Sequence, residues 1–249
     1  MNNRPAIVKL KSVRTLVRYV DKQRAVIEAC FALTDKKGFN AQPVEVHFRL
    51  TGPSGKQYTC QSPVELVEGV GRIRFEITDP RRWWPAGMGA QDLYELRMTL
   101  LVGDKSIDNW TSTVGMTSVR SPQDVAASML LVNGQQYDIQ SVVAIGRADE
   151  NSVLPVSGDM LLLVRDYFGP DQLYDAADRA GILLVQSVPL LHENEPDVTV
   201  RLEVDRLSAH PSLAGWLVDS AGRAADRIVT RIAQLDPTHN IFRNLPMAS

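Results

Sequence analysis

The segment RWWPAGMGAQDLY, residues 82–94, constrains the fold more than any other part of the chain. It holds two of the four tryptophans, together with one proline and two glycines. Each indole buries a large apolar surface and its N–H needs a hydrogen-bond partner, so two indoles at one corner are costly to place. The run LYELRMTLL, residues 93–101, follows directly and has the pattern of a strand. We therefore expect an aromatic corner that joins a neighbouring element to a β-sheet.

The bulk composition describes an ordinary globular protein. A chain of 249 residues is long enough for one large domain or two small ones. Its net charge of −2 gives no reason to expect nucleic acid or a membrane surface as a partner. The sequence shows neither a signal peptide nor the run of roughly 20 apolar residues that a membrane span requires, and it indicates no cellular location. Cys30 and Cys60 lie in separate predicted strands, and we expect two reduced thiols.

Residues 6 to about 121 have the pattern of short strands separated by turn-forming segments. The run VEVHFRL, residues 44–50, alternates strictly between apolar and polar side chains, as a half-buried strand does. Helical periodicity is absent, and short strands at regular spacing predict an antiparallel sandwich. The other strands predicted from this pattern cover residues 13–20, 25–33 and 73–77.

The pattern changes near residues 121–122, where apolar runs begin to alternate with helical segments. Repeated βα order predicts a parallel sheet with helical crossovers. We therefore expect two domains, 1–122 and 123–249, the second with four clear parallel strands and a fifth at 241–243. The predicted strands of this part cover 139–145, 160–164, 182–188 and 213–218, and the predicted helices cover 172–180, 200–209 and 224–235.

Five motifs occur in order along nearly the whole chain. They are DPRRWWPAGMGAQDLY at 79–94, LVNG at 131–134, YDAADRAGIL at 174–183, HPSLAGW at 210–216 and LDPT at 235–238. Together they resemble glycoside hydrolase family 2, the group of β-galactosidases, β-mannosidases and β-glucuronidases. The resemblance implies a multidomain β plus α/β protein, in which an immunoglobulin-like antiparallel sandwich precedes an incomplete (β/α) barrel with about four to five of the eight strands.

The resemblance also indicates where catalytic carboxylates would lie. A retaining glycosidase uses two, about 5 Å apart, as acid/base and as nucleophile. In the family the acid/base is the Glu of an Asn-Glu pair, and counting from Trp216 puts Ser220 and Ala221 at these two positions. A methyl group transfers no proton. The family's nucleophile lies on a later strand, beyond the last residue of this sequence, so we expect both carboxylates to be missing.

Few side chains in the sequence could replace the two missing catalytic carboxylates. Asp219 and Glu193 are the candidates for a relocated catalytic carboxylate. We favour a simpler interpretation of each, in which Asp219 is an exposed aspartate at a strand end and Glu193 belongs to an exposed acidic loop. The ligand-binding candidates are Arg165, Asp166, Trp216 and Asp219. The simpler interpretation of Arg165 is a structural arginine paired with Asp166, Asp219 or a carbonyl.

Other polar and aromatic features have structural interpretations that we favour. The segment HENE, 192–195, lacks a second histidine at helical spacing, so we expect no metal site there. We expect Trp83 and Trp84 to pack rather than stack on a sugar, and His210 to orient the entry to the fourth barrel strand. A carbohydrate-binding protein would use an acidic rim made of Asp149, Glu150, Asp166, Glu193 and Asp219.

We therefore expect a noncatalytic relative of family 2 that acts as a carbohydrate-related binding or structural module and needs no cofactor. The alternative is an active O-glycosyl hydrolase, or a fragment of one. A half-closed parallel sheet leaves two edges and an uncovered inner face. Helices on both faces, a second copy of the chain or further polypeptide would cover that face. We favour an incomplete barrel that is covered in a homodimer or larger assembly, with a carbohydrate as the expected ligand.

Overall fold

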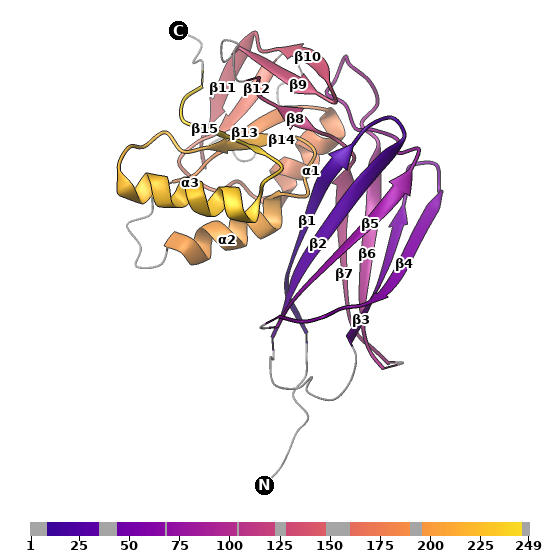
Figure 1. Ribbon diagram of the computed structural model, residues 1–249. Coiled ribbons are helices and arrows are strands. Elements are labelled where there is room, and N and C mark those ends of the chain that lie inside the picture. The colour runs from indigo at the N-terminus through magenta and orange to yellow at the C-terminus, as the bar shows by residue number, and fades with distance from the viewer. Residues whose placement is uncertain are drawn as a thin grey trace.

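The computed structural model describes residues 9–34, 44–67, 69–103, 105–122, 128–147, 160–189 and 196–245. An antiparallel sandwich forms the first part, and a parallel sheet with helices forms the second (Figure 1). This arrangement confirms the expected immunoglobulin-like sandwich followed by a partial α/β barrel. The expected domain boundary after residue 122 stays a prediction. No described helix is both long and apolar enough to span a membrane.

The sandwich consists of a three-stranded sheet, in the order β1-β2-β5, and a four-stranded sheet, in the order β4-β3-β6-β7. Every pairing within the two sheets is antiparallel. Alternating side chains from both sheets fill the space between them, and Phe48 stacks on Phe75 with ring centroids 5.3 Å apart. The strands are β1 (Leu10–Val20), β2 (Arg24–Leu33), β3 (Val44–Thr51), β4 (Gln57–Pro63), β5 (Val70–Thr78), β6 (Leu93–Val102) and β7 (Lys105–Gly115).

The two cysteines lie in different sheets of the sandwich. Cys30 is buried on β2, whereas Cys60 is half-buried on β4. The two are not joined to each other by a disulfide, and their reduced state stays a prediction.

The second part has five parallel strands in the order β11-β12-β13-β14-β15. Helices α1, α2 and α3 connect the last four of these strands in turn. A small antiparallel sheet, β10-β9-β8, precedes the parallel one. The elements are β8 (Val119–Arg120), β9 (Met129–Val132), β10 (Gln135–Asp138), β11 (Ser141–Ile145), β12 (Met160–Val164), α1 (Asp171–Ala180), β13 (Leu183–Ser187), α2 (Pro196–Leu207), β14 (Leu213–Leu217), α3 (Arg223–Leu235) and β15 (Asn240–Phe242).

Two predicted elements of this part have the wrong bounds. The strand predicted at 139–145 begins at Ser141, because the Ile139 N–H donates to the Ser128 carbonyl at 2.7 Å and closes the preceding hairpin. The helix predicted at 200–209 begins at Pro196 and ends at Leu207. Proline suits the first turn of a helix, because a backbone N–H at that position would have no acceptor within the helix.

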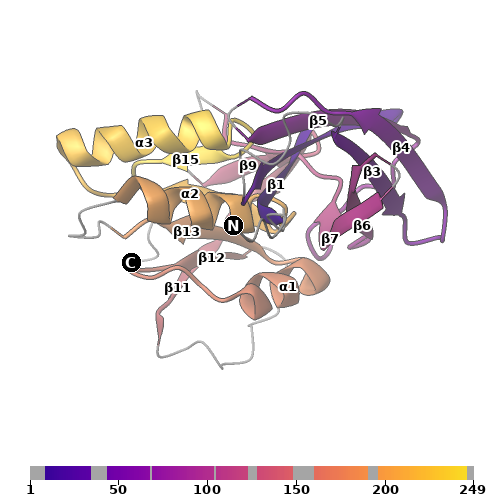
Figure 2. The ribbon, with the colours of Figure 1, turned by 90° about the horizontal axis from the view of Figure 1, so that it is seen from below.

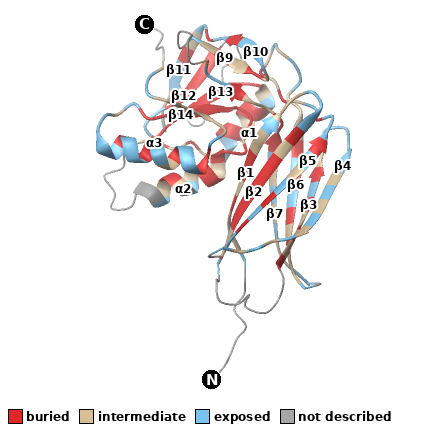
Figure 3. Ribbon diagram, in the orientation of Figure 1, coloured by how far each residue is buried: buried red, intermediate tan, exposed pale blue. Residues whose placement is uncertain are grey.

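The two faces of the parallel sheet are covered by different elements of the same chain. Alternate side chains, such as Leu184 and Trp216, pack under the three helices. Those on the opposite face, such as Leu163 and Val185, pack against the β8-β9-β10 sheet and Trp83. The expected uncovered inner face is therefore wrong for β12, β13 and β14, all of whose residues are buried (Figure 3). The edge strand β11 is partly exposed. Strands β11 and β15 remain the sheet's edges, and assembly with a second copy stays a prediction.

Candidate functional site

The carboxyl edge of the parallel sheet is where α/β proteins build their sites. Arg165 and Asp166 directly follow β12 at this edge. The Arg165 Nε lies 3.6 Å from the Asp166 carboxylate, with side chains 46% and 83% exposed. This pair agrees with the simpler interpretation of Arg165, and such an exposed contact contributes little to stability.

Asp219 lies beyond the end of β14 and is exposed. Strand β14 ends at Leu217, so both Asp219 and Ala221 lie in the loop that follows it. The carbonyl of Ser220 accepts a 2.8 Å hydrogen bond from the Arg243 guanidinium, which joins this loop to the segment after β15. Ala221 stands where the family resemblance implies an acid/base, and the loop offers Asp219 as its one carboxylate.

Trp216 is not a ligand-binding residue, and that prediction is wrong. Its side chain is fully buried on the helix side of the sheet, because alternation along β14 directs it under α3. The indole N–H donates to the Asp236 carboxylate at 2.9 Å. Burial alone would raise the pKa of Asp236, but nearby His239 and hydrogen bonds from His239, Thr238 and Trp216 hold that pKa well below its usual range.

The remaining candidates of the acidic rim lie outside the described residues. These are Asp149, Glu150 and Glu193, the last within the HENE segment at 192–195. Asp166 and Asp219 are therefore the two rim carboxylates whose positions the structure gives.

The tryptophan corner is structural. Trp83 is fully buried, and its indole N–H donates a 2.8 Å hydrogen bond to the Asp178 carbonyl on α1. Trp84 is half-buried, with the Arg82 guanidinium 4.7 Å from the ring centroid. The corner thus joins the sandwich to the second part, and Trp83 is not available to a sugar.

A polar cleft between the sandwich and helices α1 and α2 was missed by the sequence reasoning. Figure 2 shows these helices on the side of the second part that faces the sandwich. The cleft has a volume of about 580 Å³. Its walls come from strands β1, β6 and β7 and from both helices: Val13, Thr15, Glu95, Arg97, Trp110, Thr111, Ser112, Thr113, Asp171, Asp175, Asp205, Arg206, Ala209 and His210.

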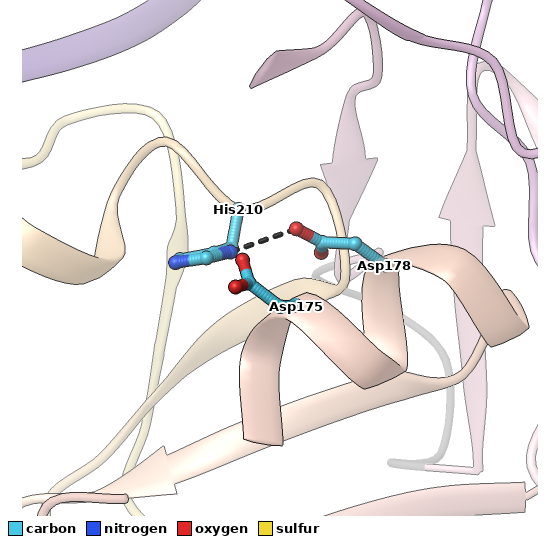
Figure 4. Close-up of side chains that lie close together, drawn as sticks. All are labelled: Asp175, Asp178 and His210. Atoms are coloured by element: carbon cyan, nitrogen blue, oxygen red, sulfur yellow. Dashed lines mark hydrogen bonds and ion pairs between the residues drawn. The ribbon is translucent and has the colours of Figure 1, made fainter. Parts of the chain in front are cut away.

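Three side chains at this cleft form a compact cluster (Figure 4). Asp175 and Asp178 lie one turn apart on α1, and both point towards His210 in the loop before β14. The His210 Nδ1 lies 2.7 Å from Asp178 Oδ2. Asp178 Oδ1 accepts from the backbone N–H and the hydroxyl of Ser212, at 3.1 and 2.5 Å. These bonds fix the loop that enters β14, as expected for His210.

Comparison with known proteins shows what this chain is similar to. The family model "Glycosyl hydrolases family 2" matches residues 8–116. An exo-beta-D-glucosaminidase of Streptomyces avermitilis is 28% identical over 176 residues, which cover 59% of this chain and 20% of that enzyme. Beta-mannosidase B of Thermothelomyces thermophilus is 25% identical over 198 residues, 65% of this chain and 22% of the enzyme. The chain is a glycosyl hydrolase family 2-like protein.

The fold of this family 2-like chain agrees with a solved structure over both of its parts. A glycosyl hydrolase family 2 member from Bacteroides cellulosilyticus superposes with a TM-score of 0.73 and 16% identity. The superposition covers 94% of this chain and 36% of that protein. The family 2-like chain therefore spans about a fifth of the length of the curated relatives and about a third of the solved one.

The match does not extend equally to the two candidate sites. The matched range 8–116 contains the sandwich and the tryptophan corner, whereas Arg165, Asp219 and Ala221 lie outside it. The cleft takes one wall from the matched range and the other from α1 and α2. Its residues are spread from Val13 to His210, so no local motif in the family 2-like sequence could have indicated it.

Proposed function

We propose that the family 2-like chain is a noncatalytic module with a carbohydrate-related binding or structural role. The observation that supports this most is Ala221, which the family resemblance puts at the position of the acid/base and which cannot transfer a proton. The carboxylates described near that edge, Asp166 and Asp219, are both exposed.

An active O-glycosyl hydrolase, or a piece of one, is the second proposal. The relatives named above are an exo-beta-D-glucosaminidase and a beta-mannosidase, and this chain spans about a fifth of each. In a longer polypeptide the carboxyl edge of the parallel sheet would form one part of a site that later segments complete. The relocated acid would then be Asp219, the carboxylate two residues from Ala221.

Hydrolysis of nitrophenyl β-D-glucosaminide and β-D-mannoside separates the two proposals. For the noncatalytic module we expect no release of nitrophenol above the buffer rate. The variants are Asp219→Asn and, as a matched control, Asp226→Asn on the exposed side of α3. Turnover that is lost with Asp219→Asn and kept with Asp226→Asn would overturn the noncatalytic proposal.

Binding and assembly are tested separately. Calorimetric titration with glucosamine and mannose oligosaccharides tests the binding role, and an absence of heat for every sugar leaves the structural role. Light scattering after size exclusion tests the proposed homodimer, which would cover the edge strands β11 and β15. A clean monomer contradicts that assembly.

A further inference from the structure

We propose that Asp175, Asp178 and His210 form a divalent-cation site at the cleft between the sandwich and α1, with zinc as the expected metal. The site lies before β14, whereas the position of Ala221 follows β14 at the opposite edge of the sheet. It is therefore separate from the proposed function and does not depend on it.

The three side chains have suitable atoms at a suitable spacing. One ligand atom from each lies within 4.8 Å of the other two. Zinc bonds to nitrogen and oxygen are about 2.0–2.2 Å long, so two ligand atoms on a tetrahedral ion are about 3.4 Å apart. Asp175 and Asp178 share one helix face, since residues three apart are neighbours on a helix.

A metal ion would take the place of a proton that the cluster already shares. The His210 Nδ1 and Asp178 Oδ2 atoms, 2.7 Å apart, are joined by one hydrogen. When the ion binds, the neutral imidazole carries its proton on Nε2 instead, and Nδ1 becomes a ligand. Ser212 holds the other oxygen of Asp178 in place, which is the kind of outer support that metal ligands have.

The charges at the cleft leave one carboxylate without a partner. Three carboxylates of the cleft wall pair with arginines: Glu95 with Arg97, Asp171 with Arg206, and Asp205 with Arg14. Within the parts of the chain that the structure describes, the Asp175 side chain has neither an ion pair nor a hydrogen bond, although it is half-buried and beside Asp178. Two carboxylates this close repel each other, and a cation between them removes the repulsion.

An unpartnered hydroxyl in the same cleft is a second, independent observation. Thr15, on β1, lines the cleft together with Asp175 and His210 and is 1% exposed. Its hydroxyl is buried and has no hydrogen-bond partner among the described residues. Buried hydroxyls are normally satisfied, so this one indicates a polar partner beside Thr15 that the described residues do not supply. A water molecule on a metal with an open coordination position is such a group.

Zinc suits this ligand set better than magnesium or calcium does. Imidazole favours zinc and its neighbours in the transition series, whereas magnesium and calcium favour oxygen ligands alone. Two carboxylates and one imidazole supply three protein ligands. A tetrahedral ion would then have one position left for water.

Isothermal titration of the whole chain with zinc chloride near neutral pH tests the site. We expect one ion per chain, and a roughly tenfold or greater loss of affinity for Asp175→Asn, which removes a ligand. The matched control is Asp171→Asn, one turn earlier on α1, which removes the same charge from a residue outside the cluster. It should keep the affinity. Cobalt substitution gives a second readout, because the visible absorption of the bound ion should change in Asp175→Asn.

A third variant, His192→Gln, excludes the other acidic histidine segment of the sequence. Binding that His192→Gln abolishes and Asp175→Asn leaves intact overturns the proposal. So does an equal loss in Asp171→Asn and Asp175→Asn, which would show nonspecific attraction to an acidic cleft. An absence of saturable heat at millimolar zinc also overturns it. Asp175→Asn should keep the fold, because the Asp175 side chain makes no described hydrogen bond.

Discussion

The indole N–H of Trp83 donates a 2.8 Å hydrogen bond to the backbone carbonyl of Asp178, which lies 95 positions later in the chain. A second bond runs alongside it, from the Ala86 N–H to the Gly181 carbonyl at 2.9 Å. A third comes from the Asn133 amide, which donates to the Trp83 carbonyl at 2.9 Å. The tryptophan corner is therefore held by α1 and by the β9–β10 turn, and it joins the two parts of the fold.

The hydrogen bond from the Trp83 indole can be removed by a substitution that keeps an aromatic ring at this position. We expect Trp83→Phe to lower the free energy of unfolding by about 2 kcal/mol, from the lost hydrogen bond and a small cavity. Truncation to Ala should cost about 4 kcal/mol, because it also removes a fully buried ring. Urea denaturation measures both values. Trp84→Phe is the control and should cost less than Trp83→Phe, since Trp84 is half-buried.

Gly181 connects α1 to the same corner, and its substitution should be costly. Its φ is +72°, and an added Cβ would lie 2.6 Å from the Ala86 backbone nitrogen. We expect Gly181→Ala to cost about 3 kcal/mol, from the left-handed backbone and from overlap with a neighbour that cannot move aside. Gly87→Ala is a matched control, because Gly87 has a φ of +85° and open space around it.

The control isolates the overlap from the backbone strain. Gly87→Ala should cost only about 1 kcal/mol, which is the strain of the left-handed backbone alone. Equal losses of unfolding free energy in the two variants would show that the contact between Gly181 and the corner adds nothing.

Most of the fold was accessible from the sequence, because local patterns determined it. The strict alternation at 44–50 gave strand β3, and the apolar run at 160–164 gave β12, at the bounds that the structure has or within a residue of them. Gly181 lies between a helical segment and an apolar run, where a helix C-cap belongs, and it adopts the left-handed conformation that such a cap requires.

The errors come from residues whose role depends on distant partners. Trp216 was a ligand candidate, but alternation along β14 and the partner Asp236 bury it under a helix. The inner face of the sheet was expected to be uncovered within one chain. In the structure the β9–β10 hairpin and Trp83 cover it, and no local sequence pattern indicates that contact. The cleft was missed for the same reason, since Thr15 and His210 are brought together only by the packing of the two parts.

A buried ion pair also joins the sandwich to the second part. Arg14 on β1 and Asp205 on α2 are 2.5 Å apart, with side chains 11% and 7% exposed. We expect Asp205→Ala to lower the unfolding free energy by about 3 kcal/mol, because it leaves a buried guanidinium without its carboxylate. Glu76→Ala, which breaks the exposed Arg24–Glu76 pair, should cost less than about 1 kcal/mol. Chemical denaturation compares the two, and similar losses would contradict the interpretation of the first pair as buried.

Asp236 should make the stability of the second part depend on pH. Its folded-state pKa is lowered, because the nearby His239 and hydrogen bonds from His239, Thr238 and Trp216 outweigh the effect of burial. A carboxyl group with a lowered folded pKa stabilises the fold fully above its unfolded pKa of about 3.9, and that contribution is lost as the pH falls through the folded value. Stability should therefore decrease below about pH 4, and part of this decrease should belong to Asp236.

The variant Asp236→Asn separates this contribution from that of the other carboxylates. At neutral pH we expect it to cost about 3 kcal/mol, since it disturbs buried hydrogen bonds from Trp216, Thr238 and His239. The difference from the unsubstituted chain should shrink as the pH is lowered, because the native carboxylate then loses its charge too. Urea denaturation at a series of pH values measures it. The control is Asp226→Asn, at an exposed position, which should change the unfolding free energy by a small amount that is the same at every pH. If the effect of Asp236→Asn is also the same at every pH, the charge of Asp236 does not stabilise the fold.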